Sequence, residues 1–282
     1  MLRLKLEPHI ATQVANAVSE DVNGGDLTAT LIPAARRGQA TVITRVAMVL
    51  CGRPWFDAVF QHISPEVRVE WRLQEGTAAQ PGQILCSIEG PARALLTGER
   101  AALNFLQTLS ATATVTKRYV DAIRGTRAVI VDTRKTLPGL RLAQKYAVRI
   151  GGGTNHRIGL YDGVLIKENH IMAAGGVVTA LRQAQQHSPA GVTIQIEVET
   201  LAQLSDALNA GAKMILLDNF DLAKMREAVT INAGRATLEA SGGVNLDTVR
   251  AIAETGVDRI SIGALTKDIQ AIDLSMRFQM AN

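Results

Sequence analysis

The sequence is poor in aromatic residues and in cysteine, and both shortages exclude classes of protein. Aromatic residues make up only 4% of the 282 positions, and the net charge is a mild +4. A nucleic-acid-binding protein usually combines a basic stripe with aromatic side chains, so we expect no nucleic-acid partner. The two cysteines, Cys51 and Cys86, stand alone and match no metal-ligand spacing. We therefore expect buried free thiols and no disulfide framework.

Long apolar runs are missing as well. No run reaches the roughly 18 residues that a membrane span requires. The N-terminal MLRLKLEPHI lacks the apolar stretch of a signal peptide. Hydrophobic residues make up 47% of the chain and charged residues 20%, which is typical of a globular protein with a full-sized core. We expect a cytoplasmic protein without a membrane partner.

The first part of the chain predicts a helix followed by short strands. The helix is expected around residues 8–18. Three β-branched or alternating stretches, separated by Gly- and Pro-containing turns, predict strands at 40–50, 67–73 and 84–90. Residues 92–125 contain no proline and are apolar at helical spacing, which predicts one long helix or two abutting ones. The stretch EDVNGGDLT, at 20–28, predicts a tight turn with Asx hydrogen bonding.

From residue 128 onward, apolar runs alternate with helical segments. The runs lie at 128–132, 163–167, 193–199, 214–219, 237–243 and 259–265. The helical segments between and after them lie at 140–150, 177–187, 201–210, 222–229 and 246–256. This rhythm indicates repeated βα units and a parallel sheet. Six such strands favour an α/β fold with an incomplete barrel; an open doubly wound sheet is the alternative. A G-x-G-x-x-G fingerprint is absent after the first run, which disfavours a dinucleotide site.

Each apolar run ends in polar residues or glycine. In α/β barrels the carboxyl ends of the strands form the rim on which active sites are built. The rim residues sort by charge along the chain. Cationic or imidazole side chains come first, carboxylates follow, and small residues come last: Arg134, Lys135, His156, Arg157 and Lys167; then Glu197 and Asp218; then Ser241, Gly242 and Gly263.

This order of charges points to an anionic ligand. An arginine grips a carboxylate through two parallel hydrogen bonds, so several arginines in one pocket imply a ligand with more than one carboxylate or phosphate. Glu197 and Asp218 could hold Mg²⁺, face positive charge on a substrate, or pair with the neighbouring lysines. Glycine and serine backbone at the last two strands can present N–H groups to a phosphate.

Two further segments, at 151–159 and 140–150, allow predictions about close contact and about exposure. The glycines of GGGTNHRIG, at 151–159, predict a close approach of another group to the backbone, next to the hydrogen-bonding side chains of His156 and Arg157. Arg141, Lys145 and Arg149 lie at i, i+4 and i+8 of a helix, which predicts a solvated face.

Several of these segments, taken in order, resemble the quinolinate phosphoribosyltransferases. The similarity rests on DTRKTLPGLR, KYAVRIGGGTNHRIGLYDGVLIKENHI, IEVET, ILLDN, EASGG and SIGAL, and it extends to EDVNGGDLT and GERAALNFLQTLSATAT. It therefore covers nearly the whole chain. It implies an N-terminal α/β sandwich domain at 1–110, joined by residues 268–282, and an α/β barrel catalytic domain at 111–267. It also implies a homodimer or higher oligomer with shared active sites.

The resemblance also implies the reaction and the role of each site residue. Phosphoribosyl pyrophosphate (PRPP) and quinolinate would react with Mg²⁺ to give nicotinate mononucleotide, pyrophosphate and carbon dioxide, a step of NAD synthesis. Arg134, His156 and Arg157 would hold the quinolinate carboxylates, with Arg100 reaching in from the partner subunit. Lys135 and Lys167 would face the pyrophosphate, the ribose or a carboxylate, and Glu197 and Asp218 the ribose hydroxyls and the metal. Ser241, Gly242 and Gly263 would cradle the 5′-phosphate.

Three alternatives are open. A paralogous group associated with molybdenum transport shares much of this fold, but Lys167 and Glu168 in GVLIKENH favour the quinolinate enzyme. A lysine at the end of a barrel strand could form a Schiff base, as in class I aldolases. A protein that binds anionic metabolites without catalysis is the third.

Overall fold

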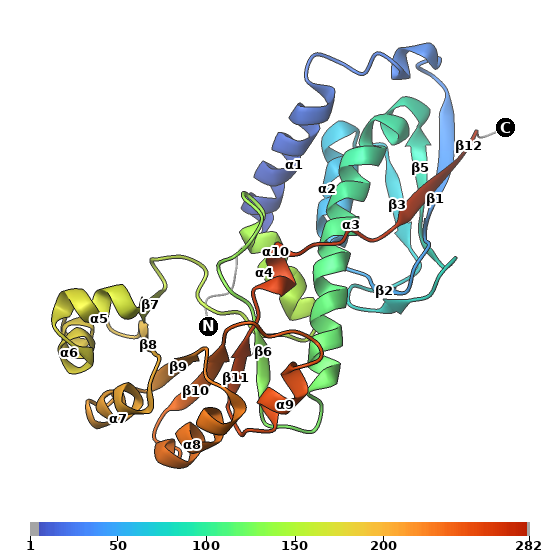
Figure 1. Ribbon diagram of the computed structural model, residues 1–282. Helices are drawn as coiled ribbons and strands as arrows, with labels where there is room; N and C mark the ends of the chain where they lie inside the picture. Colours follow the sequence, from blue (N-terminus) through green and yellow to red (C-terminus); the bar gives the residue numbers. More distant parts are fainter. Residues whose placement is uncertain (1–5, 281–282) are drawn as a thin grey trace. The chain divides into compact units, whose positions relative to one another are not determined.

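The structure is a computed structural model that describes residues 6–280 (Figure 1). The chain divides into two compact units. The first comprises residues up to 117, residues 137–152 and residues from 268 onward; the second comprises 118–136 and 153–267. The domain boundaries at residues 110 and 267, which the resemblance implies, stay a prediction. Across the described residues, every helix is too short or too polar to cross a membrane.

The first unit contains a four-stranded antiparallel sheet in the order β12-β1-β5-β3. Its strands are β1 (Arg37–Thr44), β3 (Arg68–Trp71), β5 (Ile84–Pro91) and β12 (Leu274–Met280), and a short pair is formed by β2 (Met48–Val49) and β4 (Ala78–Ala79). Apolar side chains of the sheet pack with α1 (Glu7–Val22), α2 (Arg53–Ile63) and, as far as Ala113, α3 (Ala92–Ala122). Trp55, Phe56 and Phe60 of α2 are completely buried in this core.

Most sequence expectations for this unit are confirmed. The opening helix and the three strand regions are present, and 92–125 forms one helix, α3, which ends at Ala122. In the 20–28 turn region, the Asp26 carboxylate accepts hydrogen bonds from the backbone N–H of Ala29 and the hydroxyl of Thr97. Both cysteines are buried free thiols, and burial raises the pKa of each. The sequence patterns missed α2 and β12, and the 40–50 stretch is two strands rather than one.

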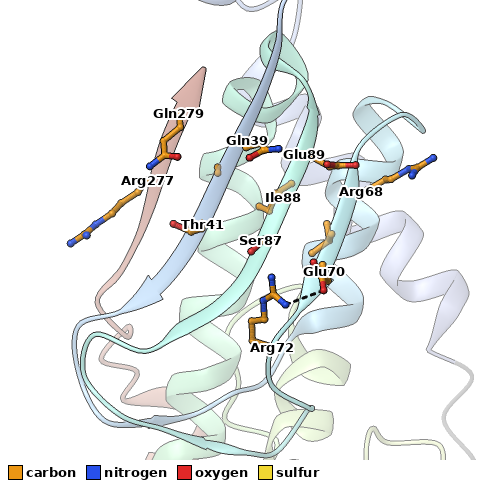
Figure 2. Close-up of a pocket in the computed structure, with 12 residues that line it drawn as sticks. Gln39, Thr41, Arg68, Glu70, Arg72, Ser87, Ile88, Glu89, Arg277 and Gln279 are labelled. Atoms are coloured by element: carbon orange, nitrogen blue, oxygen red, sulfur yellow. Dashed lines mark hydrogen bonds and ion pairs between the residues drawn. The ribbon is translucent and has the colours of Figure 1, made fainter. Parts of the chain in front are cut away.

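The second face of this sheet is polar and hollowed (Figure 2). Along β1, outward Gln39 and Thr41 alternate with buried Ala40 and Val42, as expected for a sheet that packs on one side only. The hollow has a volume of about 430 Å³. Its charged residues are Arg68, Glu70, Arg72, Glu89 and Arg277.

The helix α4 (Arg141–Ile150), also in the first unit, corrects one expectation. The solvated face predicted for Arg141, Lys145 and Arg149 is wrong at Lys145, which is 0% exposed, although Arg149 is exposed. Burial on this ten-residue helix extends beyond its apolar residues, because Gln144 is buried as well. Regular spacing of charges shows that side chains share a helix face, but it does not show what covers that face.

The second unit is built on a six-stranded parallel sheet in the order β6-β11-β10-β9-β8-β7. The strands are β6 (Val129–Val131), β7 (Gly163–Ile166), β8 (Thr193–Val198), β9 (Met214–Asp218), β10 (Thr237–Ser241) and β11 (Arg259–Ser261). All six lie within the predicted runs. The strands follow one another in cyclic order, from β7 through β11 and back to β6, with β6 and β7 at the two edges; this is the order of an incomplete barrel, as predicted, and not of a doubly wound sheet.

Helices follow the strands of this sheet along the chain (Figure 1). They are α5 (Glu168–Ala174), α6 (Val177–His187), α7 (Leu201–Asn209), α8 (Leu222–Asn232), α9 (Val249–Ala253) and α10 (Ala264–Lys267). Along each strand, alternate residues point to opposite faces. Ile196, Ile215, Leu217 and Ile260 are fully buried apolar residues, whereas the alternate positions carry many of the polar residues that form the site.

Candidate active site

A cavity of about 190 Å³ lies at the carboxyl ends of the six strands, entirely within the second unit. It is lined by Thr133, Arg134, Lys135, His156, Arg157, Leu165, Lys167, Glu197, Leu216, Glu239, Ser241 and Ser261. Seven of these residues are predicted site residues. The structure therefore brings the cationic and acidic parts of the predicted rim into one cavity.

The remaining predicted residues lie beside this cavity or in the other unit. Asp218 ends β9, and its charge acts on Glu197. Gly263 lies close to Lys135, because a Cβ at Gly263 would stand 3.1 Å from Cδ of that lysine. Arg100 is an exposed residue of α3 in the first unit, where it lines a groove of about 410 Å³.

The cationic side of the cavity holds two arginines near each other. Burial and the neighbouring charge of Arg134 lower the pKa of Arg157, while Asp162 acts in the opposite direction. Nη1 of Arg157 donates to the backbone oxygen of Gly163 at 3.0 Å. Two guanidinium groups this close repel each other, so an anion between them would relieve the repulsion.

The segment that carries His156 and Arg157 spans the open side of the barrel. Thr154 forms a parallel bridge to Val131 of β6, while Arg157 reaches the start of β7. The Asp132 carboxylate accepts from the backbone N–H of His156 at 2.8 Å and from Nδ2 of Asn155 at 2.6 Å. The segment is therefore fixed at both edges of the sheet, which gives its side chains defined positions.

The glycines that precede this segment allow the predicted close approach at Gly151. A Cβ at Gly151 would stand 2.5 Å from the backbone oxygen of Ala113 and 2.7 Å from Cβ of Thr116, both on α3. Gly152 has a φ of +89°, a conformation that other residues rarely adopt. At Gly151, the group that approaches the backbone so closely is a helix of the same unit and not a ligand.

The His156 ring uses both nitrogens within the protein. Nδ1 accepts a hydrogen bond from the backbone N–H of Arg157 at 2.8 Å, so this nitrogen carries no proton. The proton of the ring is therefore on Nε2, which lies 2.7 Å from Oε1 of Gln195 and donates to it. Both ring nitrogens of His156 are thus engaged within the protein, and its contribution to a ligand comes mainly through where it places Arg157.

Two carboxylates form the acidic part of the site. Oε2 of Glu197 lies 3.6 Å from Nζ of Lys167. Burial raises the pKa of Glu197; Lys167 opposes this shift, and the negative charges of Asp218 and Glu168 add to it. The predicted pairing with a lysine is thus present, and the two carboxylates are close enough to act on each other.

The last strands end in backbone suited to close contact with a ligand. Gly242 follows β10 with a φ of +104°, and a Cβ there would stand 2.1 Å from Oδ1 of Asn219. Only glycine fits this position. Gly243 also has positive φ, at +58°. The turn after β10 therefore has no side chains of its own at these two positions, and the Asn219 side chain lies against Gly242.

Within residues 6–280, no group of three or more His, Cys, Asp or Glu side chains is arranged to hold a metal ion. Glu197 and Asp218 are two carboxylates close enough for their charges to interact. Mg²⁺ typically takes one or two protein carboxylates and completes its shell with water and substrate phosphates. The pair fits such a shared site and does not fit a metal held by protein alone.

The sequence reasoning missed three polar residues of the barrel interior, Gln195, Glu239 and Arg259. Glu239 is 0% exposed and Gln195 is 2% exposed. Gln195 interrupts the apolar run TIQIEVE and Glu239 interrupts TLEASGG. Each lies two positions before a predicted site residue, Glu197 or Ser241, and therefore points to the same face of its strand. That two-residue period was the signal that could have identified them.

Comparison with known proteins agrees with this geometry. The family model described as quinolinate phosphoribosyl transferase, C-terminal domain, matches residues 112–277, and the one for the N-terminal domain matches residues 26–110. The chain is 38% identical over 263 residues to a probable nicotinate-nucleotide pyrophosphorylase [carboxylating] of Bacillus subtilis, covering 93% of this chain and 91% of that one.

A relative of the same name from Mycobacterium leprae is 47% identical over 212 residues, covering 74% of each chain. The solved structure of the nicotinate-nucleotide pyrophosphorylase from Francisella tularensis matches with a TM-score of 0.94, at 42% identity and 96% coverage of both chains. The two family models together span most of the chain, and the relatives match it over most of their length. The chain therefore belongs to the quinolinate phosphoribosyltransferase family.

Proposed function

We propose that this protein transfers the phosphoribosyl group of PRPP to quinolinate, with loss of carbon dioxide, to give nicotinate mononucleotide in the cytoplasmic synthesis of NAD. The observation that carries this proposal is the single cavity in which two arginines and two lysines face Glu197 at the ends of parallel strands, with Asp218 close enough to act on Glu197. Its charges suit two anionic substrates that must meet in one place. The relatives named above carry the same activity in their names.

The arginine side of the cavity suits quinolinate. Arg134 and Arg157 would each pair with a carboxylate of this flat dianion, and the ligand would relieve their mutual repulsion. His156 would contribute chiefly by fixing the backbone of Arg157, because both of its ring nitrogens are engaged within the protein.

The carboxylate side suits PRPP. Glu197 and Asp218 would contact the ribose hydroxyls and hold Mg²⁺ together with the pyrophosphate oxygens. Mg²⁺, when bound, neutralises charge on the leaving pyrophosphate. Lys135 and Lys167 would face the same oxygens or a substrate carboxylate, and the backbone at Ser241, Gly242 and Gly263 would receive the 5′-phosphate.

The chemistry then needs no protein nucleophile. The pyridine nitrogen attacks C1 of the ribose, the bond from C1 to the pyrophosphate oxygen breaks, and the leaving group takes the electron pair. As C1 becomes cation-like, Glu197 stabilises it. The bond from C2 to its carboxylate then breaks, the electron pair stays beside the positively charged nitrogen, and a proton from solvent replaces carbon dioxide. Orientation of the weak nucleophile can supply about 7–11 kcal/mol of the barrier.

We also propose that the active protein is a homodimer or a higher homo-oligomer in which Arg100 completes the site of the neighbouring subunit. In support, Arg100 is exposed in its groove, and large apolar side chains of the second unit are exposed: Leu160, Tyr161 and Met172 are 73%, 77% and 74% accessible. Co-expression of Arg100→Ala and Arg157→Ala chains, each inactive alone, should restore part of the activity. Failure of the mixture to recover activity contradicts the shared site.

The test of the main proposal is direct. Purified protein is incubated with quinolinate, PRPP and Mg²⁺, and nicotinate mononucleotide and carbon dioxide are measured. Product formation is expected with quinolinate, and far less with nicotinate, which lacks one carboxylate. Intact PRPP after incubation would identify a binding protein without catalysis. Borohydride with a keto substrate should give no adduct on Lys167; an adduct would favour the aldolase alternative.

A further inference from the structure

The interior of the barrel contains a polar layer directly below the candidate site. Gln195 of β8, Glu239 of β10 and Arg259 of β11 lie two residues before Glu197, Ser241 and Ser261 on their strands. Glu239 and Arg259 are partners in the parallel register. Parallel barrels usually fill this level with branched apolar side chains, so the polar layer requires an explanation.

Stability alone is a poor explanation for it. Oε1 of Glu239 and Nε2 of Gln195 are buried and have no hydrogen-bond partner among residues 6–280. Burying a polar group without a partner costs free energy, and a partly satisfied network is less favourable than apolar packing. Three apolar residues at these positions would be expected to stabilise the fold at least as well.

The layer instead converges on His156. Oε1 of Gln195 accepts the Nε2–H of the ring at 2.7 Å, and Oε1 of Glu239 lies 3.8 Å from the same nitrogen. Nε of Arg259 donates to Oε2 of Glu239 at 2.9 Å, which holds that carboxylate in place. The other ring nitrogen accepts from the backbone N–H of Arg157. A continuous series of contacts thus joins Arg259 to the backbone of Arg157.

The layer also separates two cavities. Glu239, His156 and Arg157 line the candidate site, whereas Gln195, Arg259, His156 and Arg157 line a second cavity of about 140 Å³ toward the amino ends of the strands. Arg157 therefore has space on both sides of its segment. Packing alone does not determine its position, and the hydrogen bond from the His156 ring to Gln195 adds to the constraints that Asp132 and Gly163 place on the segment.

We propose that Gln195, Glu239 and Arg259 are positioning residues that fix the His156 ring and, through it, place Arg157 for the carboxylates of quinolinate. This inference rests on the proposed function and assigns the layer to the quinolinate half of the site. Arg259 has a second effect there, because it compensates the charge of Glu239, which would otherwise repel an incoming dianion from the floor of the cavity.

Two variants test the proposal with apolar substitutions that the buried interior of the barrel can accommodate. Gln195→Leu removes the hydrogen bond to the ring, and the double variant Glu239→Leu/Arg259→Met replaces the ion pair by apolar groups, a change that buried pairs commonly tolerate. Thermal unfolding establishes that each variant folds. The matched control is Glu254→Leu/Arg250→Met, which removes an exposed ion pair of the same unit.

The readouts are the separate KM values for quinolinate and PRPP and the NMR signal of the His156 Nε2–H. In both test variants we expect the KM for quinolinate to rise about tenfold or more, the KM for PRPP to change less than about twofold, and the Nε2–H signal to shift or disappear. The control should change none of these. Equal changes in both KM values, or an unchanged quinolinate KM in folded variants, overturns the inference. Wild-type protein without activity on quinolinate would instead contradict the proposed function.

Discussion

The hollow on the antiparallel sheet and the barrel cavity differ in how their charges are arranged. The hollow on the sheet is the larger, at about 430 Å³ against about 190 Å³ for the barrel cavity, and it also contains arginines. On the sheet, however, positive and negative side chains alternate along neighbouring strands, and Arg72 pairs with Glu70 at 3.0 Å. Both members of that pair are more than half exposed. All five charged residues of this hollow are exposed, so solvent screens their charges.

In the barrel cavity, like charges are held together as well, beside the opposite-charge pair of Lys167 and Glu197. Burial and then the charge of Arg134 lower the pKa of Arg157; burial raises the pKa of Glu197, Lys167 opposes this shift, and Asp218 adds to it. Such arrangements are unfavourable in the empty protein and become favourable when a ligand of opposite charge arrives. A concentration of like charge therefore identifies the site more reliably than the size of a hollow. Substitutions in the two regions test that difference, from the largest expected effect to the smallest.

Arg157→Ala should have the largest effect. Removing one partner of a charge pair formed with quinolinate should weaken its capture by about 2–5 kcal/mol. Binding of quinolinate to the variant can be measured by calorimetry, with Arg250→Ala as an exposed arginine control from the same unit. Unchanged affinity for quinolinate would remove Arg157 from the pocket and weaken the contrast between the two hollows.

Glu197→Gln should lower turnover by about 100-fold and change substrate binding much less. The amide keeps the shape of the side chain and loses the negative charge that stabilises a cation-like ribose, which is an effect confined to the transition state. Steady-state kinetics separate the two quantities. A proportionate loss of affinity and turnover, or no loss in either, would argue against this role.

The pH dependence follows from the raised pKa of Glu197, which results first from burial. Since the carboxylate is the active form, kcat/KM should fall with decreasing pH at a higher pH than an ordinary glutamate would give. The free energy of unfolding of the free protein changes with pH in the opposite direction. Because the pKa of Glu197 is higher in the folded state, its stabilising contribution is fully present below the pKa of the unfolded chain and is lost as pH rises through the folded-state pKa. Glu197→Gln should therefore gain stability relative to wild type as pH rises. If kcat/KM fell at the same low pH in wild type and in Glu197→Gln, this assignment would be contradicted.

The sequence predicted the barrel and most of its rim because both depend on local periodicity. Apolar runs at regular spacing defined the six strands, and the polar residues at their ends placed Arg134, Lys167 and Glu197 in one region. What the sequence could not predict depends on contacts across the chain. The burial of Lys145, the packing of Gly151 against α3 and the engagement of both His156 nitrogens are set by residues distant in sequence.

Gly242→Ala should have an intermediate effect. The new methyl group would require alanine at a φ of +104° and would stand 2.1 Å from Oδ1 of Asn219, so the turn after β10 must shift. We expect the KM for PRPP to rise about tenfold because the shifted backbone no longer meets the 5′-phosphate, while quinolinate binding changes little. Gly243→Ala, where a Cβ would meet nothing within 4 Å, is the matched control for left-handed backbone without the clash. Equal effects of the two variants would attribute the loss to backbone conformation rather than to displacement of the turn.

The smallest effects are expected on the hollow of the antiparallel sheet. Arg72→Ala removes one exposed ion pair, which contributes about 0–1 kcal/mol to stability. Both KM values and kcat should stay within about twofold of wild type, and Arg68→Ala should behave in the same way. These variants are direct counterparts of Arg157→Ala, because all three remove an arginine from the wall of a hollow. A large loss of activity at Arg72 would show that paired, exposed arginines can serve the reaction too, and charge concentration would then no longer distinguish the two regions.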